Sequence, residues 1–140
     1  MSHSGQIESA SSCISESLIL LSEVGDITPA VYREFLRNCP DALPVTRELS
    51  QIVLGRMLGE ILYAFEQRPL NPGIVDSYLY EEAITHAPFG VTLTMYRCLI
   101  AALLTVIAHE LGTRWPDYEV EWHCHAEAML RVIKDAIAPI

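Results

Sequence analysis

The sequence predicts an all-α fold of six to eight helices with unequal lengths. Apolar residues recur at helical spacing along most of the chain, and no stretch alternates apolar and polar residues long enough to indicate a strand. Proline and glycine divide the chain into segments of helical length. At 140 residues we expect a single domain over residues 1–140.

The N-terminal part predicts two helices. Residues 1–27 contain an N-terminal segment and a first helix, expected over residues 6–23. The stretch "GDITPAVYREFL" then gives a start signal, because Thr28 can cap a helix and Pro29 suits its first turn. We expect this second helix over residues 28–38, followed by "CPDALPVT" as a turn or a single helical turn.

The remaining helices are separated by breakers. A long third helix is expected over residues 47–67, ending at "QRPLNPG", and a shorter one over 75–87. Gly90 can supply the positive φ that lets the next helix, 91–111, leave in a new direction. The stretch "TRWPD" opens the last helix. Because the lengths are unequal, we expect helices that cross and leave a cleft rather than a regular four-helix bundle.

Composition excludes several classes of protein. An apolar fraction of 51% argues against disorder, and a net charge of −9 argues against binding to nucleic acid or an anionic membrane surface. The start "MSHSGQIESASS" lacks an export signal, so we expect a cytoplasmic protein. The apolar run 98–108 is too short to span a bilayer unaided and predicts a buried core helix.

Other reactive side chains have structural interpretations. The four cysteines are far apart with no CxxC pair, which favours reduced, buried thiols. His123 and His125 point about 200° apart on a helix, so they cannot share a metal ion. Glu81 and Glu82 are expected on solvated faces.

The stretch "ITHAPFGVTLTMY", residues 84–96, raises the functional question. A lone histidine near the C-terminus of a helix, such as His86, usually interacts with the negative end of the helix dipole. Tyr32 taken alone is an ordinary half-buried aromatic residue. The spacing of the residues that follow His86 is what favours a ligand-binding site.

That spacing resembles the proximal-histidine segment of single-domain bacterial globins of the flavohaemoglobin type. His86 is followed at the family's intervals by Gly90, Val91 and Tyr96. The resemblance covers roughly residues 28–137, and further matches to the family pattern occur in the second helix and the last two, at Tyr32, Pro40, Leu111, Gly112, Trp115 and Trp122.

The resemblance implies a globin-like fold with haem b bound between the long third helix and the histidine-bearing helix. His86 would be the axial iron ligand, and Tyr32 would stabilise a bound diatomic ligand by a hydrogen bond. The other cofactor-binding residues that the resemblance implies are Leu54, Val91, Met95, Tyr96, Leu99, Met129 and Ile133.

Three family features have no clear counterpart. Arg47 stands seven residues after Pro40, where a haem-stacking phenylalanine is expected, and the nearest apolar candidates are Leu43, Val45 and Leu49. The glutamate that completes the proximal network in flavohaemoglobins is replaced by Ile137, and Asp135 is out of phase. The distal residue stays open among Ser50, Gln51, Val53 and Leu54.

The expected function is reversible binding of O₂, NO or CO, for oxygen storage or transport or for scavenging of NO. Because no flavin or nicotinamide domain follows within these residues, NO dioxygenase activity would need an external reductase as partner. A second copy of the chain, forming a homodimer, is a further partner that we consider. The alternatives are a haem-based gas sensor that signals to a partner protein, and a haem-free globin-like interaction domain.

Overall fold

The computed structural model describes residues 13–137, and every regular element within this range is a helix. The prediction of an all-α fold is thus confirmed for this part of the chain. The first helix, α1, is described over Cys13–Ser22. The later elements are α2 (Thr28–Asn38), the 3-10 turn η1 (Pro40–Ala42), α3 (Leu43–Thr46), α4 (Gln51–Gln67), α5 (Pro72–His86), η2 (Ala87–Phe89), α6 (Leu93–Leu111), η3 (Gly112–Asp117) and α7 (Glu119–Ile137).

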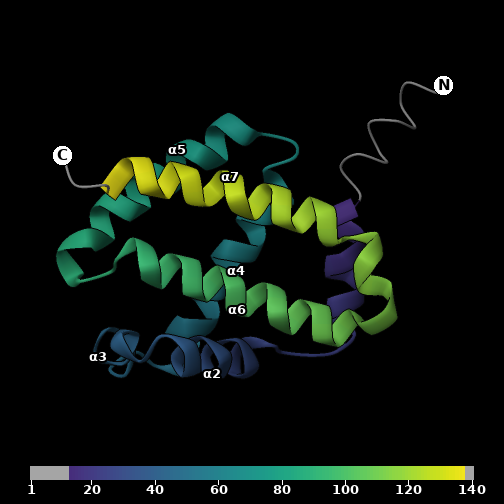
Figure 1. Cartoon of the computed structure of the whole chain (residues 1–140), viewed down its shortest axis with the longest axis horizontal. Coiled ribbons are helices and arrows are strands. Elements are labelled where there is room, and N and C mark those ends of the chain that lie inside the picture. The colour runs from purple at the N-terminus through teal and green to yellow at the C-terminus, as the bar shows by residue number, and fades with distance from the viewer. Residues whose placement is uncertain (1–12, 138–140) are drawn as a thin grey trace.

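Helices α6 and α7 form the long axis of the molecule. They run side by side in opposite directions, with α2 packed along α6 and α5 packed along α7 (Figure 1). Helix α4 contacts α2, α5 and α7 and so connects the two sides. This arrangement leaves α2, α4, α5 and α6 to surround one region of the structure, where the candidate site lies.

Helix α2 begins at Thr28 as predicted, but the predicted cap is wrong. The N-cap residue is Ile27, which makes no side-chain cap. One residue earlier, a carboxylate oxygen of Asp26 accepts a hydrogen bond from the backbone N–H of Thr28 at 2.9 Å. The hydrogen bonds from Thr28 hold the pKa of the Asp26 carboxyl below its usual range. Pro29 lies in the first turn, as expected.

Helix α4 begins at Gln51, one turn later than the predicted start at Arg47. Ser50 has an extended backbone, and its hydroxyl oxygen accepts from the N–H of Val53 at 3.2 Å. The preceding sequence "LPVT" forms the four-residue helix α3, which confirms the single helical turn predicted within "CPDALPVT". The boundary therefore depends on a serine cap that the hydrophobic pattern did not reveal.

The other boundaries differ from the predictions by one turn or less, except at the last helix. Helix α5 begins at Pro72 instead of Val75. Gly90 has φ +89°, which confirms the predicted left-handed turn before α6. The stretch around "TRWPD" forms η3 rather than the start of the last helix, and α7 begins only at Glu119.

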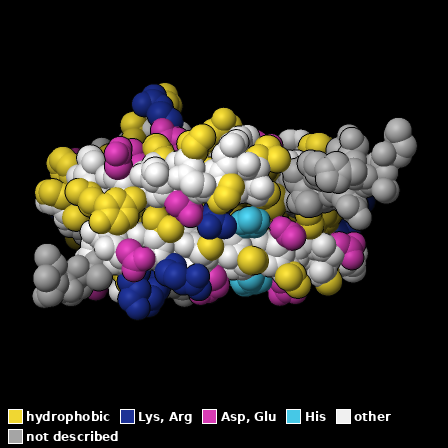
Figure 2. Space-filling view, turned by 90° about the horizontal axis from the view of Figure 1, so that it is seen from above, with side chains coloured by type: hydrophobic (Ala, Val, Ile, Leu, Met, Phe, Trp, Pro, Cys, Tyr) yellow, Lys and Arg dark blue, Asp and Glu magenta, His cyan; other side chains and the backbone are white. Residues whose placement is uncertain are grey.

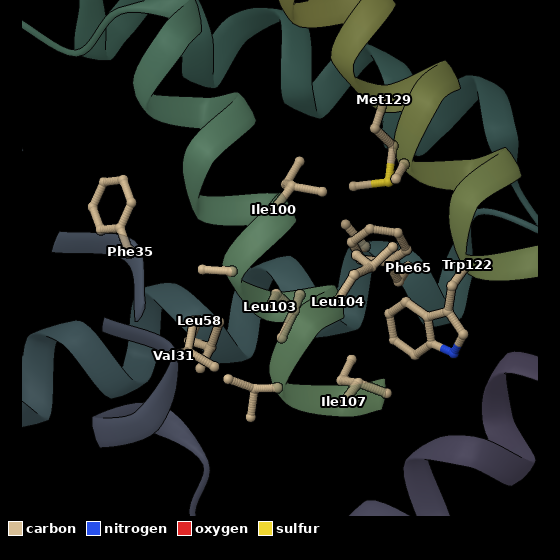
Figure 3. Packing of buried hydrophobic residues seen from close by; sticks show 14 of the residues in the cluster. Val31, Phe35, Leu58, Phe65, Ile100, Leu103, Leu104, Ile107, Trp122 and Met129 are labelled. Carbon is tan, nitrogen blue, oxygen red and sulfur yellow. The ribbon is translucent and has the colours of Figure 1, made fainter. Parts of the chain in front are cut away.

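The core is centred on α6 and continues to Trp122 on α7. Leu103, Ile107 and Trp122 are completely buried, and the Trp122 ring packs on Phe65 with 4.7 Å between ring centroids (Figure 3). The indole N–H of Trp122 donates to the Ser17 hydroxyl at 2.9 Å, so this polar atom has a partner inside the core.

Part of the apolar surface of α6 is buried in this core. By length and composition alone, Leu93–Asp117 could cross a membrane. In the structure, seven residues of α6 are buried against its neighbours: Ile100, Ala102, Leu103, Leu104, Val106, Ile107 and Leu111. The four cysteines carry free thiols, of which Cys39 is buried and Cys124 is exposed.

Candidate functional site

A cavity of about 160 Å³ lies among α2, α4, α5 and α6, and we call it the His86 cavity. Helix α5 contributes the histidine, and the other helices contribute mainly apolar and aromatic side chains. The complete lining is Tyr32, Phe35, Ala42, Val45, Thr46, Leu49, Met57, Glu60, Ile61, Tyr78, Leu79, Glu82, His86, Val91, Met95, Tyr96 and Leu99.

The imidazole of His86 is held in one orientation by Glu82, one turn earlier on α5. Its Nδ1 lies 2.7 Å from the backbone carbonyl oxygen of Glu82 and 3.3 Å from a carboxylate oxygen of the same residue. Because a carbonyl oxygen only accepts, Nδ1 carries the proton of the neutral ring. The lone pair therefore sits on Nε2, for which the structure shows no hydrogen bond to a described residue.

Tyr32 lines the same cavity from α2. It is buried, and its hydroxyl donates to the backbone carbonyl of Leu54 at 3.3 Å, a long hydrogen bond. Burial raises the pKa of Tyr32 to about 12. The phenol is therefore a protonated hydrogen-bond donor at neutral pH, with its present acceptor at the edge of the usual range.

Two further tyrosines and two carboxylates line the cavity. Burial, aided by the negative charge of Glu82, raises the pKa of Tyr96 to about 12. The hydroxyl of Tyr78 donates to the Glu60 carboxylate at 3.0 Å, and its pKa is also raised to about 12, first by burial and then by this bond. Among residues 13–137, no Lys or Arg lines the cavity, so the carboxylates of Glu60 and Glu82 make its described lining negative.

The structure brings together six of the nine residues expected to bind the cofactor. They are His86, Tyr32, Val91, Met95, Tyr96 and Leu99. Leu54, Met129 and Ile133 do not line the cavity, although all three are buried. Met129 and Ile133 lie on α7, which packs on α5 and α6, and Met129 points into the core in the direction of Phe65 and Trp122 (Figure 3).

None of the four candidates for the distal residue reaches the cavity. Ser50 caps α4, and Gln51, Val53 and Leu54 are absent from the lining. The residues of α4 that line the cavity are Met57, Glu60 and Ile61. The i, i+4 spacing of Met57 and Ile61 is the signal in the sequence that could have identified them.

The connection between α2 and α4 lines the cavity with small and aliphatic side chains. Val45, Thr46 and Leu49 line it, whereas Arg47 is exposed and absent from the lining. Sequence reasoning missed two aromatic residues of the lining, Tyr78 of α5 and Phe35 of α2. The ring of Phe35 stands edge-on to Tyr32 with 6.2 Å between centroids. Phe35 lies one turn after Tyr32 on the same face of α2.

His123 and His125 have different surroundings on α7. The ring of His123 lies edge-on to Trp115, and its Nε2 is 3.8 Å from the Glu119 carboxylate. Nδ1 of His125 lies 3.2 Å from the guanidinium of Arg68. Among residues 13–137, no three His, Cys, Asp or Glu side chains are placed to hold a metal ion together.

The arrangement can therefore do two things chemically. His86 offers the Nε2 atom of an oriented imidazole, and Tyr32 offers one buried hydrogen-bond donor, both in a cavity whose lining is mainly aliphatic and aromatic. A scan against models of known protein families and a search of curated proteins found no match to this chain.

Proposed function

We propose that this chain is a globin-like haem protein that binds a diatomic gas at an iron ligated by His86. The observation that carries the proposal is the hydrogen bond from His86 Nδ1 to the carbonyl of Glu82. Because His86 lines the cavity and Nδ1 is engaged, the lone pair of Nε2 is left to bind a metal. Iron-ligating imidazoles are commonly oriented by such a bond from the second ring nitrogen.

The residues present fit haem at the iron and along the apolar walls. A neutral imidazole is a common axial ligand, and most of the lining is aliphatic or aromatic, as for other cofactor sites. Haem iron, when bound, supplies the coordination position that accepts O₂, NO or CO. Tyr32 would then donate its hydroxyl hydrogen to the gas ligand in place of the weak bond to Leu54.

The charged edge of a haem fits less well. Haem b carries two propionates, whereas the described lining residues include two carboxylates, Glu60 and Glu82, and no Lys or Arg. The cavity volume of about 160 Å³ is also below the roughly 300 Å³ at which small-molecule sites begin, so the walls must open to admit a macrocycle. Met57 and Met95, two flexible side chains in the lining, are suited to such a rearrangement.

These two observations favour a second candidate function, a haem-free globin-like interaction domain. In that case the His86–Glu82 bond only stabilises the end of α5, where a histidine also interacts with the helix dipole. The two candidates predict opposite results when the protein meets free hemin.

The experiment is a titration of the purified protein with hemin, followed by visible absorption. For the haem protein we expect a one-to-one complex with a Soret band and an unchanged helical circular dichroism spectrum. If no Soret band forms while the helical signal remains native, the haem proposal is wrong and the interaction domain is favoured. Binding and autoxidation of O₂, and conversion of NO to nitrate, then distinguish storage from scavenging.

A further inference from the structure

A second hollow lies on the outer face of the α6–α7 pair, apart from the His86 cavity. It has a volume of about 690 Å³ and shares no lining residue with that cavity. Its walls are two stripes of residues at helical spacing, from Arg97 to Ala108 on α6 and from His123 to Lys134 on α7. We call it the Arg131 groove.

One end of the groove is cationic. Arg97, Arg131 and Lys134 line it where the beginning of α6 lies beside the end of α7, and all three are exposed. The chain has only nine Lys and Arg residues and a net charge of −9. A site with three of these nine cations is therefore unlike the rest of the acidic chain. Within residues 13–137, none of the three is in an ion pair with a carboxylate, whereas Arg37, Arg47 and Arg68 are.

The rest of the groove is largely apolar. Its floor includes three buried residues, Ile100, Leu104 and Ala126. Ala101 also lines the groove, and its small side chain leaves space for a ligand. Trp115 closes the other end, where its ring contacts His123. The one acidic residue of the lining is Glu127. From Arg97 to Ala108 the groove extends about 16 Å, at 1.5 Å of rise per helical residue.

We propose that the Arg131 groove binds a single-chain anionic amphiphile, a fatty acid as the free carboxylate. The carboxylate would contact Arg97, Arg131 and Lys134, and the acyl chain would lie along the apolar floor toward Trp115. Guanidinium groups hold carboxylates by charge-assisted hydrogen bonds, and the acyl chain is stabilised by removal of its apolar surface from water. This inference does not depend on haem binding.

The distribution of charge favours a small amphiphile over a macromolecule. A nucleic acid or an acidic helix presents charges along its whole length, whereas the cations of the groove are gathered at one end. A volume of about 690 Å³ lies within the range of small-molecule sites. In the face seen in Figure 2, one group of Lys and Arg side chains lies near the C-terminal end, and others lie at the centre and at the upper edge of the view.

The test is calorimetric titration of the full chain with laurate below its micellar concentration, with dodecanol as a neutral ligand of the same chain length. We expect one site for laurate per chain. The variant R131Q/K134Q should bind laurate at least about tenfold more weakly, because two charge-assisted contacts are lost, and should bind dodecanol like the wild type. The fluorescence of Trp115, at the apolar end, should change on binding and cease to respond in W115F.

The matched control is R33Q/R56Q, which removes two exposed cations that do not line the groove. It should leave laurate affinity within about twofold of the wild type, because exposed charges outside the site are screened by salt. The blocking variant A101F should abolish binding of both ligands while the helical circular dichroism signal stays native.

Four outcomes would overturn the proposal. They are no binding of laurate by the wild type, equal weakening in both double variants, binding that survives A101F, and binding only to laurate-containing vesicles. The third would place the ligand in another cavity, and the fourth would identify a membrane surface as the occupant.

Discussion

The Nδ1 atom of His86 lies 2.7 Å from the backbone carbonyl oxygen of Glu82, and a carboxylate oxygen of Glu82 lies 3.3 Å from the same nitrogen. One residue thus offers two acceptors to one imidazole N–H. A carboxylate from the histidine's own helix lies within reach of the same ring nitrogen.

The negative charge of the His86 cavity should weaken its affinity for haem. Replacing Glu60 with Gln removes one carboxylate from the lining while keeping an acceptor for the Tyr78 hydroxyl. We expect E60Q to bind hemin several-fold more tightly than the wild type, measured by competition with apomyoglobin. The control E81Q removes an exposed charge from α5 outside the cavity and should leave the affinity unchanged. Equal effects of the two variants would show that only net charge matters.

The Tyr32 hydroxyl is the hydrogen-bond donor expected to retain O₂. In Y32F the phenol oxygen is lost and the apolar ring remains, so the dissociation rate of O₂ from the hemin-loaded, reduced protein should rise by about tenfold, equivalent to about 1.4 kcal/mol. Stopped-flow mixing with CO measures this rate. Y80F, at an exposed position outside the cavity, is the control. If Y32F releases O₂ at the wild-type rate, the Tyr32 hydroxyl of the wild type keeps its bond to Leu54 and does not contact O₂.

Stability should fall in alkaline solution as the cavity tyrosines begin to ionise in the unfolded chain. The pKa of Tyr32 and of Tyr96 is about 12 in the folded protein, chiefly because of burial, against about 10 when unfolded. Between pH 10 and pH 12 the folded state therefore binds more protons, and the free energy of unfolding must decrease as pH rises. Urea unfolding at several pH values measures this slope. The variant Y32F/Y96F should have a shallower slope, and an equal slope would contradict the account.

The ion pair between Arg68 and Asp76 joins the end of α4 to α5. Arg68 Nε lies 2.9 Å from Asp76 Oδ1, and both side chains are largely shielded from solvent. Asp76→Ala leaves the guanidinium without its carboxylate, and we expect a loss of about 2 kcal/mol in the free energy of unfolding. Glu34→Ala breaks an ion pair in which Arg37 is exposed, and the loss should be clearly smaller because solvent screens this pair. Equal losses in chemical denaturation would contradict this ranking.

The sequence predicted the helices and the histidine side of the cavity better than the distal side. His86, Gly90 and Tyr96 are close in the chain, so their spacing determines their placement through local helix and turn geometry. On the distal side, the candidates lie at the start of α4, whereas the structure lines the cavity with Met57 and Ile61, further along the helix. Which turn of α4 meets the cavity is set by tertiary packing, which the periodicity of one helix does not encode.

The expected wall from α7 shows a second limit of sequence reasoning. Helical spacing identified Met129 and Ile133 as apolar residues of one face, and both are buried. It could not tell whether that face meets the cavity or the core, because α7 has α5 and α6 as neighbours. Such a choice between two apolar environments is made by tertiary packing, which the periodicity of a single helix does not encode.

The central claim is that Nε2 of His86 ligates haem iron. The most direct measurement is the visible spectrum of the hemin-loaded variant His86→Gly, recorded with and without added imidazole. The account predicts that the spectrum changes on mutation and returns to that of the wild type when imidazole replaces the missing ring. His123→Gly, on the exposed face of α7, should leave the spectrum unaltered. A His86→Gly protein with the wild-type spectrum in the absence of imidazole would contradict the claim.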